Sequence, residues 1–213
     1  MEKLCIFDLD GTVLNTLDSI AYFVNEALKE YGIEPVKADT IRTFVGSGAR
    51  NLIMKSLNFR NSDLDVSEVL KTYMEKYNKD ATYLVTPYDG MMELLDTLKA
   101  NGVKIAVLSN KPHSSTTIIL DKVFGEGYFY EVRGSKDDEP KKPDPTTTNE
   151  IAKGFSKKNC FFIGDSGIDI KTGQNAEMVT IGVSWGFRGA DVLKEAGADH
   201  IVDTPREMLD IIL

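Results

Sequence analysis

The sequence predicts an α/β fold, with a mostly parallel sheet, helices on both of its faces, and an all-helical insertion after the first strand. Three observations support this prediction. Short apolar runs recur along the chain, helical patterns separate most of them, and the region after the first run contains helical patterns alone. Continuous apolar runs are typical of strands covered on both faces, and strands that alternate with helices indicate right-handed crossovers within one parallel sheet.

Six segments are expected to contain strands, because each is apolar and ends in small, polar or acidic residues. They are KLCIFDLD, VKIAVLSN, YFYEVRGS, NCFFIGDS, MVTIGVSW and the shorter HIVD. Between them, MMELLDTLKANG keeps its apolar residues on one helical face and stops at Asn101–Gly102, a common helix C-terminus. DPTTTNEIAKGF and ADVLKEAG indicate two further helices.

The region from about Thr16 to about Thr82 contains helical patterns and no convincing strand. The expected helices are Thr16–Tyr31, Thr40–Leu57 and Val66–Tyr77. Pro87 and Gly90 mark the return to the sheet. The sequence therefore predicts an α/β core formed by residues 1–15 and 83–213, and an inserted helical domain formed by residues 16–82.

Composition and charge exclude several classes of protein. The chain has 213 residues, of which 42% are hydrophobic and 27% charged, as in ordinary globular proteins. A net charge of −8 argues against nucleic acid or an anionic membrane as the main partner. No apolar stretch reaches membrane-spanning length, and the N-terminus lacks a signal-peptide pattern. Cys5 and Cys160 lie in apolar runs, so we expect buried, reduced thiols and a cytoplasmic protein.

Polar residues follow three of the predicted strands. Asp8 and Asp10 end the first, Ser109 and Asn110 the second, and Asp165 a later one. Ligands of a parallel α/β sheet bind outside the carboxyl ends of its strands. We therefore expect these side chains to meet at one edge of the sheet.

The acidic residues Asp8, Asp10 and Asp165, with Asp169 one turn further on, favour a site for a hard cation such as Mg²⁺. The alternative for Asp169 is a helix N-terminal cap. A calcium loop of the EF-hand type is excluded, because Ser19 stands where its twelfth-position glutamate would be needed.

A phosphate ligand would also need a cation and hydrogen-bond donors. Lys141 and Lys142 precede Pro143 in a rigid loop that could direct an ammonium group into the site, although a solvated basic turn is the alternative. Thr12, Ser109 and backbone amides near Asn110 could donate to phosphate oxygens.

In this order, DLDGT, VLSN, KKPDP and IGDSGID resemble the four motifs of the haloacid dehalogenase superfamily of phosphohydrolases. The resemblance covers the whole chain and implies a Rossmann-like core with an inserted all-α cap. FVGSGARNL and TGQNAEMVTIGVSWGFRG are similar to segments of the phosphoglycolate-phosphatase-like branch. One residue departs from that branch: Glu177 stands where a glycine is common.

The resemblance implies a role for each matching residue. Asp8 would be the nucleophile that forms an aspartyl-phosphate, and Asp10 would be the general acid and base. Lys142, rather than Lys141, would offset phosphoryl charge, and Ser109 would bind a phosphate oxygen. Mg²⁺ would be held by the residues Asp8, Asp10 (through its backbone carbonyl), Asp165 and Asp169. Asp10 also favours phosphoryl transfer, because the dehalogenases of the superfamily lack this second aspartate.

The cap is expected to enclose the substrate. GSGAR, residues 46–50, could form a turn facing the site, with Arg50 binding a substrate carboxylate; the alternative leaves Arg50 in solvent. The predicted activity is hydrolysis of small phosphomonoesters, with 2-phosphoglycolate as the first candidate, by a monomer or homodimer. Alternatives are a pyrophosphatase or nucleotidase, a phosphomutase of the β-phosphoglucomutase kind, and a binding protein without turnover.

Overall fold

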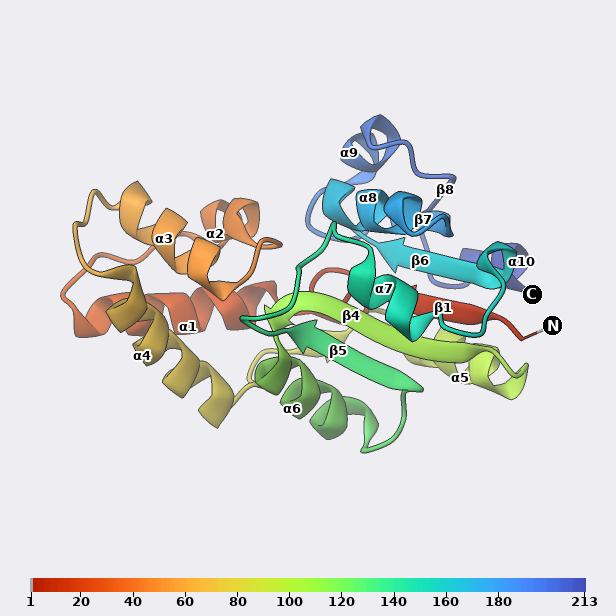
Figure 1. Ribbon diagram of the computed structural model, residues 1–213. Coiled ribbons are helices and arrows are strands. Elements are labelled where there is room, and N and C mark those ends of the chain that lie inside the picture. The colour runs from red at the N-terminus through yellow and green to blue at the C-terminus, as the bar shows by residue number, and fades with distance from the viewer. Residues whose placement is uncertain (1) are drawn as a thin grey trace.

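A six-stranded sheet forms the centre of the computed structural model, which describes residues 2–213 (Figure 1). Its strand order is β5-β4-β1-β6-β7-β8, and all neighbouring strands are parallel. The strands are β1 (Leu4–Phe7), β4 (Lys104–Pro112), β5 (Glu131–Ser135), β6 (Cys160–Gly164), β7 (Val179–Val183) and β8 (His200–Val202). All six lie within or overlap the segments predicted from the sequence, so the predicted α/β fold is confirmed.

Helices cover both faces of this sheet. Side chains alternate between the two faces of a strand, and here apolar side chains point to both faces. On β1, Cys5 and Phe7 belong to the larger core cluster, whereas Leu4 and Ile6 belong to the smaller one. The covering helices are α5 (Met91–Ala100), α6 (His113–Phe124), α7 (Thr146–Ile151), α8 (Gly167–Asn175), α9 (Ala190–Glu195) and α10 (Glu207–Ile212), with a 3₁₀ turn at Lys157–Asn159. None of the helices in residues 2–213 is long and apolar enough to cross a membrane.

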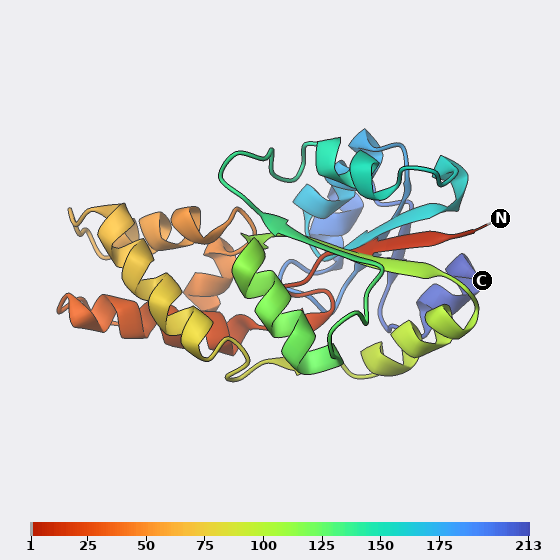
Figure 2. The same cartoon turned by 60° about the horizontal axis from the view of Figure 1, so that its bottom comes forward.

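Four further helices lie together beside the sheet, at the end opposite both chain termini (Figures 1 and 2). They are α1 (Leu17–Glu30), α2 (Ala38–Phe44), α3 (Ala49–Phe59) and α4 (Val66–Lys79). Buried aromatic side chains hold α1 against α4, where the ring centroids of Phe23 and Tyr77 are 5.2 Å apart. The helix expected at Thr40–Leu57 is therefore two helices, because the chain turns at Val45–Gly48, where both glycines have positive φ.

A short antiparallel ribbon joins the two chain segments that connect these helices to the sheet. It consists of β2 (Leu14–Asn15) and β3 (Thr86–Pro87). The sequence did not predict this pair, because two-residue strands are too short for any hydrophobic period. The ribbon lies next to both predicted domain boundaries. The segment that leaves the sheet is therefore paired with the segment that returns to it.

Glu177, the residue that departs from the glycine pattern, adopts a left-handed conformation with φ of 57° after α8. Its backbone N–H donates to the Gln174 carbonyl oxygen and closes the helix end. The turn therefore keeps the shape that favours glycine, at a cost of about 1 kcal/mol for a residue with a side chain.

Candidate active site

Three buried carboxylates meet at the carboxyl edge of the sheet. Asp8 directly follows β1, Asp165 directly follows β6, and Asp169 lies in the first turn of α8. One oxygen from each lies within 4.8 Å of the others. The Asp8 backbone N–H donates to the Ile163 carbonyl oxygen of β6 at 2.8 Å. This hydrogen bond fixes the Asp8 backbone to the neighbouring strand.

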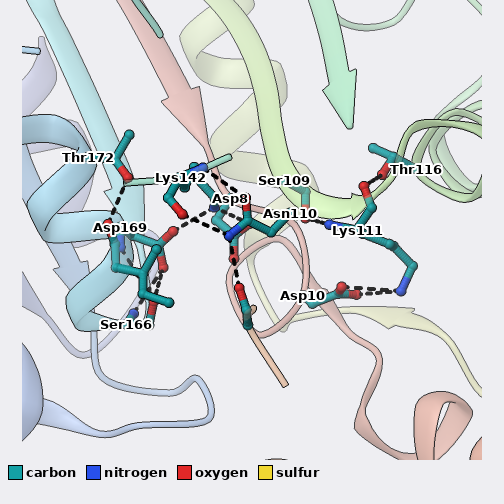
Figure 3. A network of polar contacts seen from close by, with 12 residues as sticks. Asp8, Asp10, Ser109, Asn110, Lys111, Thr116, Lys142, Ser166, Asp169 and Thr172 are labelled. Atoms are coloured by element: carbon teal, nitrogen blue, oxygen red, sulfur yellow. Dashed lines mark hydrogen bonds and ion pairs between the residues drawn. The ribbon is translucent and has the colours of Figure 1, made fainter. Parts of the chain in front are cut away.

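Lys142 is the cation of this cluster (Figure 3). Its Nζ lies 2.7 Å from Asp8 Oδ1 and 2.6 Å from Asp169 Oδ1. Asn110 holds the lysine in place, since its side chain accepts from the Lys142 N–H at 3.0 Å and donates to the Lys142 carbonyl oxygen at 3.2 Å. Lys141, in contrast, is exposed.

Asp169 serves two purposes at once. Its Oδ2 accepts from the Ser166 backbone N–H at 3.1 Å and from the Ser166 hydroxyl at 2.6 Å, as part of a capping box at the start of α8. Its Oδ1 faces Lys142. Asp169 therefore caps α8 and contacts Lys142 with the same carboxylate, and the cap fixes the direction of that carboxylate.

Two glycines leave the space that these carboxylates occupy. A Cβ on Gly11, where φ is +89°, would lie 2.5 Å from Asp165 Oδ2. A Cβ on Gly164 would lie 2.2 Å from the Cβ of Asp169. Because real Cβ contacts are longer than this, any side chain at either position would displace an acid of the cluster.

The cluster is short of positive charge. Burial raises the pKa of Asp8 to about 7, and Asp169 and Asp10 add to the rise, although Lys142 opposes it. Burial, with Asp169 and Asp8 beside it, also holds the pKa of Asp165 well above its usual value. Burial lowers the pKa of Lys142, but Asp169 and Asp8 more than offset this and raise it. When all three carboxylates are ionised, they leave two negative charges beyond that of the one ammonium, and such an oxygen-rich set fits a divalent cation.

Asp10 points away from this cluster and has its own partners. Lys111 Nζ lies 3.1 and 3.2 Å from its two carboxylate oxygens, and the Thr16 hydroxyl donates to it at 2.7 Å. The Asp10 carboxylate is therefore separate from the three acids, as Figure 3 shows. Burial lowers the pKa of Lys111, but Asp10 beside it leaves that pKa above its ordinary value.

Sequence reasoning missed Lys111. Its signal was its position, directly after Ser109 and Asn110 at the predicted strand end. The strand extends two residues beyond the predicted end, to Pro112, and so carries Lys111 to the same edge as the aspartates.

A cavity of about 350 Å³ lies between this edge and helices α1–α4. Its sheet side contains the charged residues described above together with Ser109 and Asn110. The side formed by the helices and the turn before α3 is largely apolar. The lining residues there are Ile20, Val45, Gly46, Gly48, Ala49, Leu52 and Tyr73. A small polar group bound to the acids would therefore be enclosed by apolar side chains.

Residues 5–183 match the family of haloacid dehalogenase-like hydrolases. The chain belongs to this family. The expected family, and the assignment of the chain as a hydrolase, are thereby confirmed.

Named relatives of this hydrolase agree with the expected class, phosphoric monoester hydrolases. A phosphoglycolate phosphatase of Psychrobacter arcticus is 30% identical over 100% of the chain and 96% of its own length. The phosphoglycolate phosphatase of Haemophilus influenzae strain Rd is 28% identical over 99% of the chain and 98% of its own length. A solved structure from Lactobacillus delbrueckii subsp. bulgaricus, provisionally assigned as a phosphoglycolate phosphatase, has a TM-score of 0.91 and 32% identity over 100% of this chain and 99% of its own.

Two residues proposed for substrate binding lie elsewhere in this hydrolase. Arg50 is exposed on α3, does not line the cavity, and donates to the Ser67 hydroxyl of α4 at 3.2 Å. Thr12 is fully buried and also lies outside the cavity lining, and its carbonyl oxygen accepts from the Trp185 ring N–H. The structure therefore brings neither side chain into the cavity, since Arg50 faces solvent and Thr12 is buried outside the lining.

Proposed function

We propose that the protein is a Mg²⁺-dependent phosphatase of small phosphomonoesters, with 2-phosphoglycolate as the first candidate substrate. The observation that carries this proposal is the buried set of Asp8, Asp165 and Asp169 with Lys142, at the floor of the cavity. The names of the relatives support the choice of substrate. A volume of about 350 Å³ suits a small ester, since it lies near the lower end of ligand pockets.

The reaction has two steps at phosphorus. An Asp8 oxygen attacks the phosphorus atom, and the ester oxygen leaves with the bonding electron pair and takes a proton from Asp10. Water then attacks the aspartyl-phosphate and gives a proton to Asp10, so that inorganic phosphate leaves and the Asp8 carboxylate is restored. Lys142 stabilises the charge on the transferring group, and Ser109, which lines the cavity, binds a phosphate oxygen.

The donor set fits Mg²⁺, for which the residues would be Asp8, Asp165 and the backbone carbonyl of Asp10, with Asp169 in support. The ion supplies positive charge against the phosphoryl oxygens. The Asp10 side chain would not be a ligand of the ion, because it faces Lys111 and Thr16.

Helices α1–α4 are the cap in this proposal, with the division into residues 1–15 and 83–213 and residues 16–82. Two side chains of the core hold the turn before α3 over the site. Asn110 donates to the Gly46 carbonyl oxygen at 3.0 Å, and Arg188 donates to the Val45 carbonyl oxygen at 2.6 Å. Closure by this turn would keep water away from the phosphoryl group before the alcohol leaves.

The test is phosphate release across a panel of phosphomonoesters, pyrophosphate, nucleotides and hexose phosphates, with Mg²⁺ and with EDTA. We expect release that EDTA abolishes, led by 2-phosphoglycolate. Release led by pyrophosphate or nucleotides would keep the reaction and change the substrate. Conversion of a hexose 1-phosphate to its 6-phosphate would instead identify a mutase, and no turnover of any compound would contradict the proposal.

A further inference from the structure

Lys111 is a buried cation at the edge of the cavity that the steps above do not use. Its side chain is 6% exposed and lines the cavity, and its Nζ contacts both oxygens of Asp10. The Tyr77 ring, with its centroid 4.5 Å from Nζ, packs against the ammonium from the α4 side. An ammonium group so enclosed is held in one place and presents a fixed charge to whatever enters beside Asp10.

Three cationic side chains line the cavity within residues 2–213: Lys111, Lys142 and Arg188. Lys142 is bound between Asp8 and Asp169. Arg188 donates to the carbonyl oxygens of Arg42 at 2.9 Å and Val45 at 2.6 Å, at the end of α2. Arg50, the residue first expected to bind a carboxylate, lies outside the cavity. Lys111 is therefore the cation placed to meet the part of the substrate that leaves.

The position of Asp10 determines what Lys111 meets. As the proton donor of the proposed reaction, Asp10 must contact the ester oxygen of the substrate. The carbon chain attached to that oxygen then begins beside Asp10. It also lies next to Lys111, whose Nζ is 3.1 Å from Asp10 Oδ1. An acidic group on the first of these carbons would come within reach of Lys111, whereas the helical side of the cavity offers mainly apolar contacts.

We propose that Lys111 binds a carboxylate of the leaving group and thereby selects phosphomonoesters of small α-hydroxycarboxylic acids. The inference rests on the proposed function and deepens it, because it names the residue and the chemical group that set the specificity. An ammonium group has three N–H donors, so Lys111 can add a carboxylate to its contact with Asp10. Asp10 also keeps a second partner, the Thr16 hydroxyl at 2.7 Å, when a substrate carboxylate shares the Lys111 ammonium.

The test compares two esters that share a two-carbon skeleton and differ in the carboxylate: 2-phosphoglycolate and ethyl phosphate. We would measure kcat/KM for both with Mg²⁺, in the parent protein and in Lys111→Met, Lys111→Arg and Lys104→Met. Lys104 is the matched control, because it is an exposed lysine at the opposite end of the same strand. The ratio of the two kcat/KM values cancels any loss of correctly folded protein.

We expect the parent to prefer 2-phosphoglycolate and Lys111→Met to reduce that preference by about 10- to 100-fold, the usual value of a charge-assisted hydrogen bond. Lys111→Arg should retain part of the preference, and Lys104→Met all of it. An equal loss for both esters in Lys111→Met would overturn the inference and leave Lys111 as a partner of Asp10 alone. A parent that hydrolyses both esters equally well would overturn it while the proposed function stands, and a parent that hydrolyses neither would overturn both.

Discussion

The two sides of the cavity are built from different chemistry. The sheet side carries the four carboxylates of Asp8, Asp10, Asp165 and Asp169, with two lysines bound between them. The helical side carries Ile20, Leu52 and Tyr73, which are buried in the larger core cluster. The same helical residues thus line the cavity and pack in the larger core cluster.

This difference assigns the reacting groups to the sheet side and the apolar walls of the cavity to the helical side. A backbone hydrogen bond between parallel strands holds Asp8, and the capping box of α8 orients the carboxylate of Asp169. The apolar side contributes shape and excludes water, and no single residue there carries a reaction step. Loss of the proposed nucleophile on the sheet side should therefore abolish turnover, whereas changes at the junction of the two sides should alter how well substrate is held.

The largest effect is expected for Asp8→Asn, which removes the nucleophile while keeping the size of the side chain. Turnover should fall by about 10⁴-fold or more, as for other catalytic nucleophiles. Phosphate release with 2-phosphoglycolate and Mg²⁺ measures it, and the exposed Asp63→Asn is the control. An Asp8→Asn protein within tenfold of the parent would contradict the division between the two sides.

The second prediction concerns the two uncompensated negative charges of the sheet side. Mg²⁺ should stabilise the folded protein by about 2.7 kcal/mol at a concentration 100 times its Kd, because it binds the folded state alone. For a chain of this length we expect thermal unfolding to shift upward by about 5–10 °C relative to EDTA.

Asp165→Asn is the matched variant for that measurement, since it removes one ligand charge and retains the shape of the side chain. Its shift with Mg²⁺ should be much smaller than that of the parent. Equal shifts in both proteins would place the cation elsewhere.

A smaller effect is expected at the junction of the two sides, where Arg188 binds the carbonyl oxygens at the end of α2. Arg188→Met should lower kcat/KM by about tenfold, the equivalent of one charge-assisted hydrogen bond. Hydrogen exchange at the amides of residues 45–48 should accelerate, because the turn is released from the core. The exposed Arg206→Met is the control, and unchanged exchange in Arg188→Met would show that Arg188 does not hold the turn.

The smallest effect is expected far from the cavity, where Asp199 accepts from the Thr180 backbone N–H and hydroxyl, each at 2.8 Å. These hydrogen bonds hold the pKa of Asp199 below its usual value. A depressed folded-state pKa stabilises the protein above the unfolded-state value of about 3.9, and this contribution is lost as the pH falls through the folded-state pKa.

Asp199→Asn should therefore reduce the free energy of unfolding by no more than about 1 kcal/mol at pH 7, because Asp199 is exposed. The difference from the parent should shrink as the pH is lowered from 6 toward 3, and kcat/KM should not change. Urea unfolding across this pH range measures it, with the exposed Asp137→Asn as control. A difference that grew toward low pH would contradict the assigned direction.

The α/β fold, the six strands and the placement of Asp8 and Asp165 at one edge of the sheet could be predicted from the sequence alone. These features follow from local patterns: apolar runs of strand length, helical spacing between them, and the shared edge of parallel strand ends. The motifs carried by Asp8, Asp10, Lys142 and Asp165 also indicated the family, because each combines a residue type with a fixed place beside a strand or proline.

Which side chains of the helical segment reach the cavity depends on tertiary packing and could not be predicted from the sequence. Arg50 had the right charge and followed a flexible turn, yet the orientation of α3 directs it to Ser67. Lys111 belongs to no recognised motif, and it meets Asp10 because β4, the neighbour of β1, extends to Pro112. Such contacts join residues 101 positions apart in the chain. These contacts depend on how helices and strands pack, and the local spacing of residues in the sequence does not predict that packing.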